Sequence, residues 1–233
     1  MKKHSKRYRS ALEKVEEGKS YELLADAFQC LLEMPAAKFD ETIELSMHLA
    51  VDPKQSDQMV RGIVQLPHGN GKEVRVVAFT TKPEEALGAG ACAAGLTDLI
   101  EKVKEGWLDF DVAVATPEAM KEVKAVARIL GPRGLMPNPK TGTITEDLVI
   151  CIEALKKGRV EFKMDKSANV QMGVGKRSLG IQKLVENAES ALQAIQHAHP
   201  ASLKGKFVKR ATVSTTMSPG LTLHETLLVR YGK

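Results

Sequence analysis

The sequence predicts a mixed fold of α/β and α+β type: a discontinuous α+β (split β-α-β) domain built from both ends of the chain, with an α/β domain inserted between them. Three observations predict it. Apolar and polar residues alternate in residues 43–49 and 160–164, as in strands with one wet face. Nearly continuous apolar runs lie at 74–79 and 112–115. Helical patterns alternate with these runs, which is typical of a small parallel sheet covered by helices.

The breaks between these patterns set the expected domain boundaries. Residues 1–67 and 159–233 are expected to form the discontinuous domain, and residues 68–158 the inserted one. The run Leu66–Lys72 is rich in glycine and proline, and it precedes the first continuous apolar run. Gly158 ends a helical pattern that starts near Glu146, after which alternation returns.

Further elements of the discontinuous domain follow from spacing. Apolar residues recur at helical spacing between Tyr21 and Leu32, with Ser20 as the expected N-cap. Residues 180–197 carry the pattern of an amphipathic helix. Two strands are predicted after it, at Phe207–Thr215 and Leu221–Tyr231.

The positive charge is unevenly distributed. Residues 1–67 and 68–158 each carry a net charge of −1, whereas residues 159–233 carry +7. A basic stretch is the electrostatic signature of a phosphate binder, and a solvated surface is the alternative explanation. Aromatic residues make up only 4% of the chain, which argues against base stacking on rows of exposed rings. A reader of nucleic-acid shape and backbone fits better.

Cysteine use and the chain start bear on location. Cys30, Cys92 and Cys151 are few, odd in number and far apart, so they indicate neither a disulfide framework nor a zinc site and favour a reducing cytoplasm. The basic head Lys2–Arg9 is followed by no apolar stretch, and no run of about 18 apolar residues occurs, so we expect no membrane association. The head is either an arm that touches RNA or a frayed terminus.

A nucleotide-dependent enzyme that uses the inserted domain is the main alternative, but the expected spacings fail. The stretch Gly88–Ala93 lacks the third glycine of a dinucleotide-binding loop. Gly175-Lys176-Arg177 lacks both the upstream glycine and the hydroxyl residue of a phosphate-binding loop. His197 and His199 lack the spacing that would direct both rings to one metal. We therefore expect no catalytic residues, no cofactor and no metal.

The stretch Ile129–Thr143 combines Gly-Pro turns, three prolines and two cations. It closely resembles the signature loop of the family of bacterial large-ribosomal-subunit protein number one. Three other stretches resemble the same family in the right order, so the resemblance covers essentially the whole chain. They are Lys38–Thr42, then Asp57–Gly62 with Leu66–Gly69, and finally Ser214–Met217.

This resemblance implies a discontinuous α+β RNA-binding domain with an inserted Rossmann-like domain. It implies a non-enzymatic, cytoplasmic, ribosome-associated protein, monomeric when free, that binds large-subunit ribosomal RNA and forms the mobile stalk at the exit site. The family assists the release of deacylated exit-site tRNA. In bacteria it represses translation of its own operon by binding a similar site in the mRNA.

Carried over by matching positions, the resemblance implies an RNA-contacting surface of seven residues: Lys38, Phe39, Glu41, Lys166, Thr216, Met217 and Ser218. Lys166 would neutralise phosphate, the hydroxyls and amides of Thr216 and Ser218 would reach ribose and phosphate, and the apolar side chains would contact a sugar or base. Alternatively Phe39 belongs to a core and Thr216-Met217 to a strand end.

The chain departs from the family's usual residues at four positions. Ser218 stands where glycine is usual, and Gln171, Leu179 and Arg210 stand where histidine, phenylalanine and serine are common. Arg210 adds a cation that could contact phosphate. Besides the RNA-binding protein and the enzyme, a protein-binding scaffold is a third hypothesis, and it requires a large exposed apolar patch.

Overall fold

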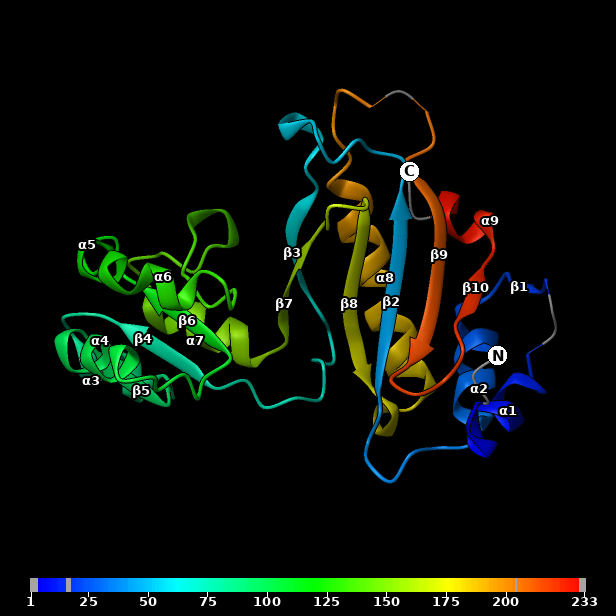
Figure 1. Ribbon diagram of the computed structural model, residues 1–233, viewed down its shortest axis with the longest axis horizontal. Coiled ribbons are helices and arrows are strands. Elements are labelled where there is room, and N and C mark those ends of the chain that lie inside the picture. The colour runs from blue at the N-terminus through cyan, green and yellow to red at the C-terminus, as the bar shows by residue number, and fades with distance from the viewer. Residues whose placement is uncertain (1–3, 16–17, 204, 231–233) are drawn as a thin grey trace. The chain divides into compact units, whose positions relative to one another are not determined.

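The computed structural model describes residues 4–15, 18–203 and 205–230. The chain has a mixed α/β fold and divides into two compact units, Met1–Lys72 with Val160–Lys233, and Glu73–Arg159. We call these the terminal unit and the inserted unit (Figure 1). Both junctions fall slightly later in the chain than the sequence patterns place them. Lys2 and Lys3 of the basic head lie outside the described residues, and the rest of the head enters a short helix.

The terminal unit contains a five-stranded sheet with the strand order β1-β10-β9-β2-β8 and a two-stranded sheet, β3-β7. In chain order its elements are α1 (Lys6–Leu12), β1 (Ser20–Tyr21), α2 (Leu24–Glu33), β2 (Thr42–Leu49), η1 (Ser56–Gln58), β3 (Arg61–Gln65), β7 (Arg159–Lys163), β8 (Asn169–Lys176), η4 (Arg177–Leu179), α8 (Ile181–His197), β9 (Val208–Thr215), β10 (Leu221–Leu223) and α9 (Glu225–Arg230). Strand β2 pairs antiparallel with both β8 and β9, so it is an interior strand of the larger sheet, next to the edge strand β8.

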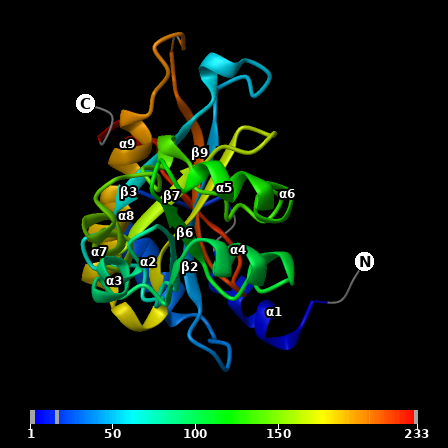
Figure 2. The ribbon, with the colours of Figure 1, turned by 90° about the vertical axis from the view of Figure 1, so that its left-hand side faces the viewer.

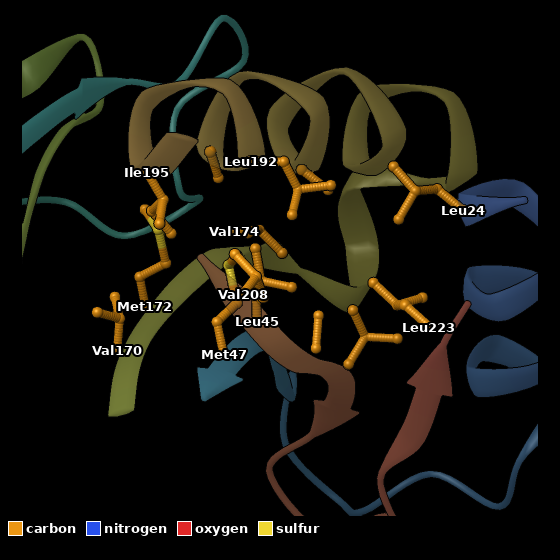
Figure 3. Packing of buried hydrophobic residues seen from close by; sticks show 14 of the residues in the cluster. Leu24, Leu45, Met47, Val170, Met172, Val174, Leu192, Ile195, Val208 and Leu223 are labelled. Carbon is orange, nitrogen blue, oxygen red and sulfur yellow. The ribbon is translucent and has the colours of Figure 1, made fainter. Parts of the chain in front are cut away.

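One face of the five-stranded sheet packs against helices α8 and α2. Every second side chain of β2, such as Leu45 and Met47, is fully buried on this face. Figure 3 shows Leu45, Met47 and Met172 directed toward Leu192 and Ile195 of α8. The period of two in β2 and the helical period in α8 therefore meet in one core, as the sequence patterns predict.

The opposite face of this sheet carries no helix in the part of the chain that is described, and Figure 1 looks onto it, with α8 behind the strands. The side chains that point to this side are polar or absent. They come from β2, β8, β9 and β10: Glu44, Ser46, His48, Asn169, Gln171, Gly173, Arg210, Thr212, Ser214 and Thr222. We call this surface the open face.

The inserted unit is built on a parallel three-stranded sheet with the order β5-β4-β6, covered on both sides. Val77 and Phe79 of β4 pack with α4, α5 and α6, whereas Val76 and Ala78 pack with α3 and α7, and Figure 2 shows these two groups of helices on opposite sides of the strands. Its elements are β4 (Val76–Phe79), α3 (Pro83–Gly88), β5 (Ala93–Gly95), α4 (Thr97–Lys104), β6 (Val112–Ala115), α5 (Met120–Val123), η2 (Lys124–Val126), α6 (Ala127–Leu130), η3 (Pro139–Thr141) and α7 (Leu148–Lys156).

Two predicted elements have other bounds in the structure: the first long helix starts later, and the last strand ends earlier. Ser20 is not a helix cap, because Ser20 and Tyr21 pair in parallel with β10, and α2 begins only at Leu24. The strand predicted over Leu221–Tyr231 ends at Leu223, and α9 follows it, opened by Glu225, whose negative charge is favourable in the first turn of a helix. Tyr231 lies outside the described residues.

Candidate nucleic-acid interface

The register of the sheet arranges the open face in rows across three strands. His48 lies between Asn169 and Arg210, Ser46 between Gln171 and Thr212, and Glu44 between Gly173 and Ser214. Several of these side chains, including Ser46, Gln171 and Thr212, make no hydrogen bond within the described residues. Their donors and acceptors are therefore free for a ligand, which must itself be polar, because a buried polar group without a hydrogen bond is costly.

The turns at residues 38–42 and 216–218 meet at one end of the open face, which we call the loop end. The backbone N–H of Thr216 donates to the carbonyl oxygen of Thr42 at 3.0 Å. The backbone N–H of Thr42 donates to Oγ1 of Thr216 at 3.1 Å. These two bonds continue the β2–β9 ladder past the end of β9, so the structure brings Lys38, Phe39, Thr216, Met217 and Ser218 to the same edge.

Exposure separates the members of the loop end. Phe39 is 53% exposed and Met217 is 47% exposed, so neither is a core residue. The core alternative for Phe39 is therefore wrong. Lys38 and Thr216 are also exposed, and Ser218 is half-buried. Exposed large apolar side chains beside polar ones are suited to packing against a sugar or a base.

The hydroxyls of Thr216 and Ser218 already have partners inside the protein. Oγ1 of Thr216 also donates to the carbonyl oxygen of Thr42 at 3.3 Å. Oγ of Ser218 accepts from the N–H of Thr215 at 2.9 Å and donates to the carbonyl oxygen of Pro219 at 2.9 Å. Because a hydroxyl has one proton and two lone pairs, each can accept one more hydrogen bond but can donate none. They can bind a ribose 2′-OH as acceptors, but they cannot donate to phosphate.

A backbone donor at the loop end remains available. The N–H of Ser218 is used in the turn, where it donates to the carbonyl oxygen of Thr215 at 3.2 Å. The N–H of Met217 has no partner within the described residues. The Met217 amide is thus the group of this turn that can donate to a phosphate oxygen.

Glu41 is placed differently from the other predicted site residues, because it is only 1% exposed. Its Oε1 accepts from the N–H of Ala37 at 2.8 Å, and its Oε2 lies 3.5 Å from Nη1 of Arg177. Nη2 of Arg177 donates to the carbonyl oxygens of Leu32 and Met34. The Glu41–Arg177 pair fixes the base of the turn that exposes Lys38 and Phe39 at its tip. Glu41 therefore positions these residues and is not itself accessible.

The cations of the last third do not all face one way. Nζ of Lys176 donates to Oγ1 of Thr42 at 2.8 Å, and Arg177 is used in the buried pair with Glu41. Lys206 pairs with Glu225, and Lys183 lies on α8, which covers the other face of the sheet. Arg210 is the arginine on the open face itself. The excess charge therefore overstates the number of cations available to one ligand.

Lys166 lies at the opposite end of the open face from the other predicted residues. It is exposed in the turn between β7 and β8, next to the paired residues His48 and Asn169. Strand β2 separates the two ends by about 20 Å at 3.3 Å per residue. The Asp165 carboxylate accepts from the N–H groups of Ser167 and Asn169 at 2.7 and 2.8 Å, and these bonds to backbone amides lower the pKa of Asp165.

The open face itself was missed as a site by the sequence reasoning. The alternation of β2 identified Glu44, Ser46 and His48 as a wet face, but the strands that flank β2 cannot be read from that pattern. The structure places Gln171 and Arg210, two positions where the chain departs from the family's usual residues, on this face beside them.

The inserted unit has a hollow of about 180 Å³ at the carboxyl ends of β4 and β6, lined by Thr80, Thr116, Glu85, Glu118 and Glu146 among others. Lys82 also lines it, with Nζ 3.6 Å from Oε1 of Glu85, but the three carboxylates outnumber this cation and oppose the binding of a polyphosphate. Among the described residues, no cluster of His, Cys, Asp and Glu is suited to hold a metal ion. A search of the same residues finds no helix with the length and apolar character needed to span a membrane.

The fold and the open face define a class of mixed α/β protein that presents a polar sheet surface, with exposed apolar residues at one end. Comparison with known proteins is more specific. The model of the ribosomal protein L1p/L10e family matches residues 31–219. The chain therefore belongs to the ribosomal protein L1p/L10e family, and as a ribosomal protein it is associated with the ribosome in the cytoplasm.

Curated relatives are similar along nearly their whole length. The large ribosomal subunit protein uL1 of Kosmotoga olearia is 48% identical over 225 residues, which cover 96% of this chain and 97% of the relative. The protein of the same name from Nocardia farcinica is 50% identical over 223 residues, covering 95% and 94%. That from Maridesulfovibrio salexigens is 47% identical over the full length of both chains.

Proposed function

We propose that this protein is a structural constituent of the large ribosomal subunit that binds large-subunit ribosomal RNA through the open face and its two ends. The family supports the ribosomal role. The observation that carries the proposed site is the row Gln171-Ser46-Thr212, whose side chains have free hydrogen-bonding groups, on the same face whose loop end exposes Phe39 and Met217. Glu41 supports the site and does not touch RNA.

The proposed mode of recognition follows from the available groups. Oγ1 of Thr216 and Oγ of Ser218 accept from ribose 2′-OH groups, which DNA lacks. At the loop end, the Met217 amide and the Lys38 ammonium bind phosphate. At the opposite end of the open face, Lys166 binds phosphate. Phosphate contacts supply affinity that falls with salt, whereas 2′-OH and apolar contacts supply the preference for one RNA shape.

The finer roles are part of the same proposal. The RNA-bound protein forms the mobile stalk at the exit site and assists the release of deacylated tRNA. When free and monomeric, it represses its own operon by binding an mRNA site of similar shape, so mRNA and ribosomal RNA compete for one face. We also propose that residues 1–67 and 159–233 form a split β-α-β RNA-binding domain and that residues 68–158 form a Rossmann-like domain without an enzymatic role.

The test uses the exposed methionine at the loop end. Met217→Ala should weaken binding to the large-subunit ribosomal RNA about tenfold, because the contact with a sugar or base is lost. Binding to a random RNA duplex should change little. Leu23→Ala is a matched control, because Leu23 is 52% exposed and lies in the same unit at the start of α2, which packs on the other face of the sheet. Equal losses on both RNAs, or in both variants, would contradict the proposed site.

Footprinting of the intact protein on ribosomal RNA tests the function as a whole. Protection should be confined to one structured region and should be reduced by the Met217→Ala change. Absence of any protected region at protein concentrations that saturate nonspecific binding would overturn the proposed function.

A further inference from the structure

A hollow lies in the open face near its Lys166 end, about 240 Å³ in volume. Seven residues line it: the buried Met47 and six residues with polar side chains, Ser46, His48, Asn169, Gln171, Arg210 and Thr212. We call it the Arg210 hollow. The register explains its composition, because the six polar residues form two neighbouring rows of the open face, Asn169-His48-Arg210 and Gln171-Ser46-Thr212.

Arg210 has most of its hydrogen-bonding capacity unused. Nη2 donates to Oγ1 of Thr222 at 2.9 Å, and no carboxylate among the described residues pairs with the guanidinium. A guanidinium has five N–H donors in a planar fork that matches a phosphate. The bond to Thr222 fixes the side chain on the face and leaves the remaining donors for an anion.

The other polar side chains of the hollow are of two kinds: those that hold a neighbouring side chain and those whose hydrogen-bonding groups are free for a ligand. Asn169 is held at both atoms of its amide, since its Oδ1 lies 2.9 Å from Nδ1 of His48 and its Nδ2 donates to Oδ2 of Asp165 at 3.3 Å, which leaves one N–H and one lone pair. It fixes the His48 ring and leaves Nε2 of that ring facing solvent. Ser46, Gln171 and Thr212 make no side-chain hydrogen bonds within the described residues, so they can donate to and accept from the edge of a base or a ribose.

We propose that the Arg210 hollow binds one unpaired nucleotide of the RNA ligand, with its phosphate on Arg210 and its base or ribose edge on Gln171 and Ser46. This inference rests on the proposed RNA-binding function. A nucleotide matches this combination, an arginine without a carboxylate partner in the lining beside neutral groups that both donate and accept. A paired duplex would leave the hollow empty, because its bases are stacked inside the helix.

The first test separates the phosphate contact from general charge. Arg210→Ser should weaken binding to the structured ribosomal RNA at least about tenfold and reduce the slope of log K against log salt by about one. Lys183→Ser removes the same charge from the covering helix α8, on the other side of the sheet, and should leave the slope unchanged. Equal behaviour of the two variants would overturn the Arg210 contact.

The second test asks whether a base occupies the hollow. Gln171→Met keeps the size of the side chain and removes its hydrogen bonds, so the loss should be about threefold to tenfold. Abasic substitutions scanned through the RNA should weaken wild-type binding at one position and have little further effect on the Gln171→Met variant there. If losses add at every position, only backbone lies on this face and the inference fails.

These outcomes are distinguishable from failure of the proposed function itself. In that case the wild-type protein would show no preference for ribosomal RNA over a random duplex. If the wild type shows the preference while both hollow variants retain it undiminished, the protein binds this RNA elsewhere on the open face.

Discussion

The two main sheets of this chain differ in what covers them. In the inserted unit, Val76 and Val77 point to opposite sides of β4, and both are fully buried. In the terminal unit, Leu45 is fully buried while its neighbour Glu44 is exposed. A sheet covered on both faces offers a ligand only the ends of its strands, whereas an open sheet offers whole rows of side chains. Under the proposed function, the covered sheet serves structure alone, and the open sheet serves recognition as well.

The largest expected effect tests this difference directly. Phe79→Ala in β4 should destabilise the inserted unit by about 3–5 kcal/mol, and Val76→Ala on the other face of the strand by roughly 2 kcal/mol. In β2, Leu45→Ala should cost about 2–5 kcal/mol, whereas Ser46→Ala should stay within about 0.5 kcal/mol. Denaturant unfolding, with amide exchange in each sheet as the readout, measures the change in unfolding free energy for each of the four variants. A cost for Ser46→Ala as large as that for Leu45→Ala would mean that the open face is covered.

An element of the fold could be predicted from the sequence where its own residues determine it, and could not where a partner far along the chain determines it. Strand β2 and helix α8 were predicted almost to the residue, because each carries its own period, and β6 matches its prediction. Ser20 was misassigned because its partner Thr222 lies at the other end of the chain. An N-cap residue and a strand residue both have an extended backbone, so the local sequence around a serine does not distinguish them.

The site followed the same rule. The resemblance named Lys38, Phe39, Lys166 and Met217, and the structure finds them exposed. The burial of Glu41 could not be inferred, because it depends on Arg177, more than a hundred residues later in the chain. Nor could the grouping of Ser46 with Gln171 and Thr212, because register is set by pairing between distant strands.

The two ends of the open face are held by different means, which leads to a second prediction. Arg177 has a side-chain exposure of 17% and Glu41 of 2%, so their ion pair is largely removed from water. Arg177→Met should destabilise the terminal unit by about 3 kcal/mol, because it leaves the Glu41 carboxylate buried without its cation. Adding Glu41→Gln should recover part of this loss, and thermal unfolding measures both.

RNA binding distinguishes support from contact at this end. Under conditions where it is still folded, the Arg177→Met variant should bind ribosomal RNA more weakly because the 38–42 turn is less ordered. The slope of log K against log salt should not change, since Arg177 touches no phosphate. Lys38→Ala is the comparison, and it should reduce that slope by about one. A reduced slope for Arg177→Met would show that the guanidinium reaches the RNA.

The smallest expected effect concerns the Lys166 end, where the support is an exposed carboxylate. Asp165 accepts hydrogen bonds from the N–H groups of Asn169 and Ser167, and it closes a turn in which Ala168 adopts a left-handed φ of 60°. Because these bonds lower the pKa of Asp165 in the folded protein, its contribution to stability is present above the ordinary aspartate pKa and is lost as the pH falls through the lowered folded value.

Asp165→Asn should therefore lower the thermal midpoint slightly at pH 7, and this difference from wild type should vanish as acidification protonates the wild-type carboxyl group. Amide exchange of Ser167 and Asn169 should be faster in the variant at pH 7. Exchange at the loop end, about 20 Å away along β2, should be the same in both proteins. A difference that persists unchanged below the lowered pKa would mean that the charge of Asp165 does not hold this turn.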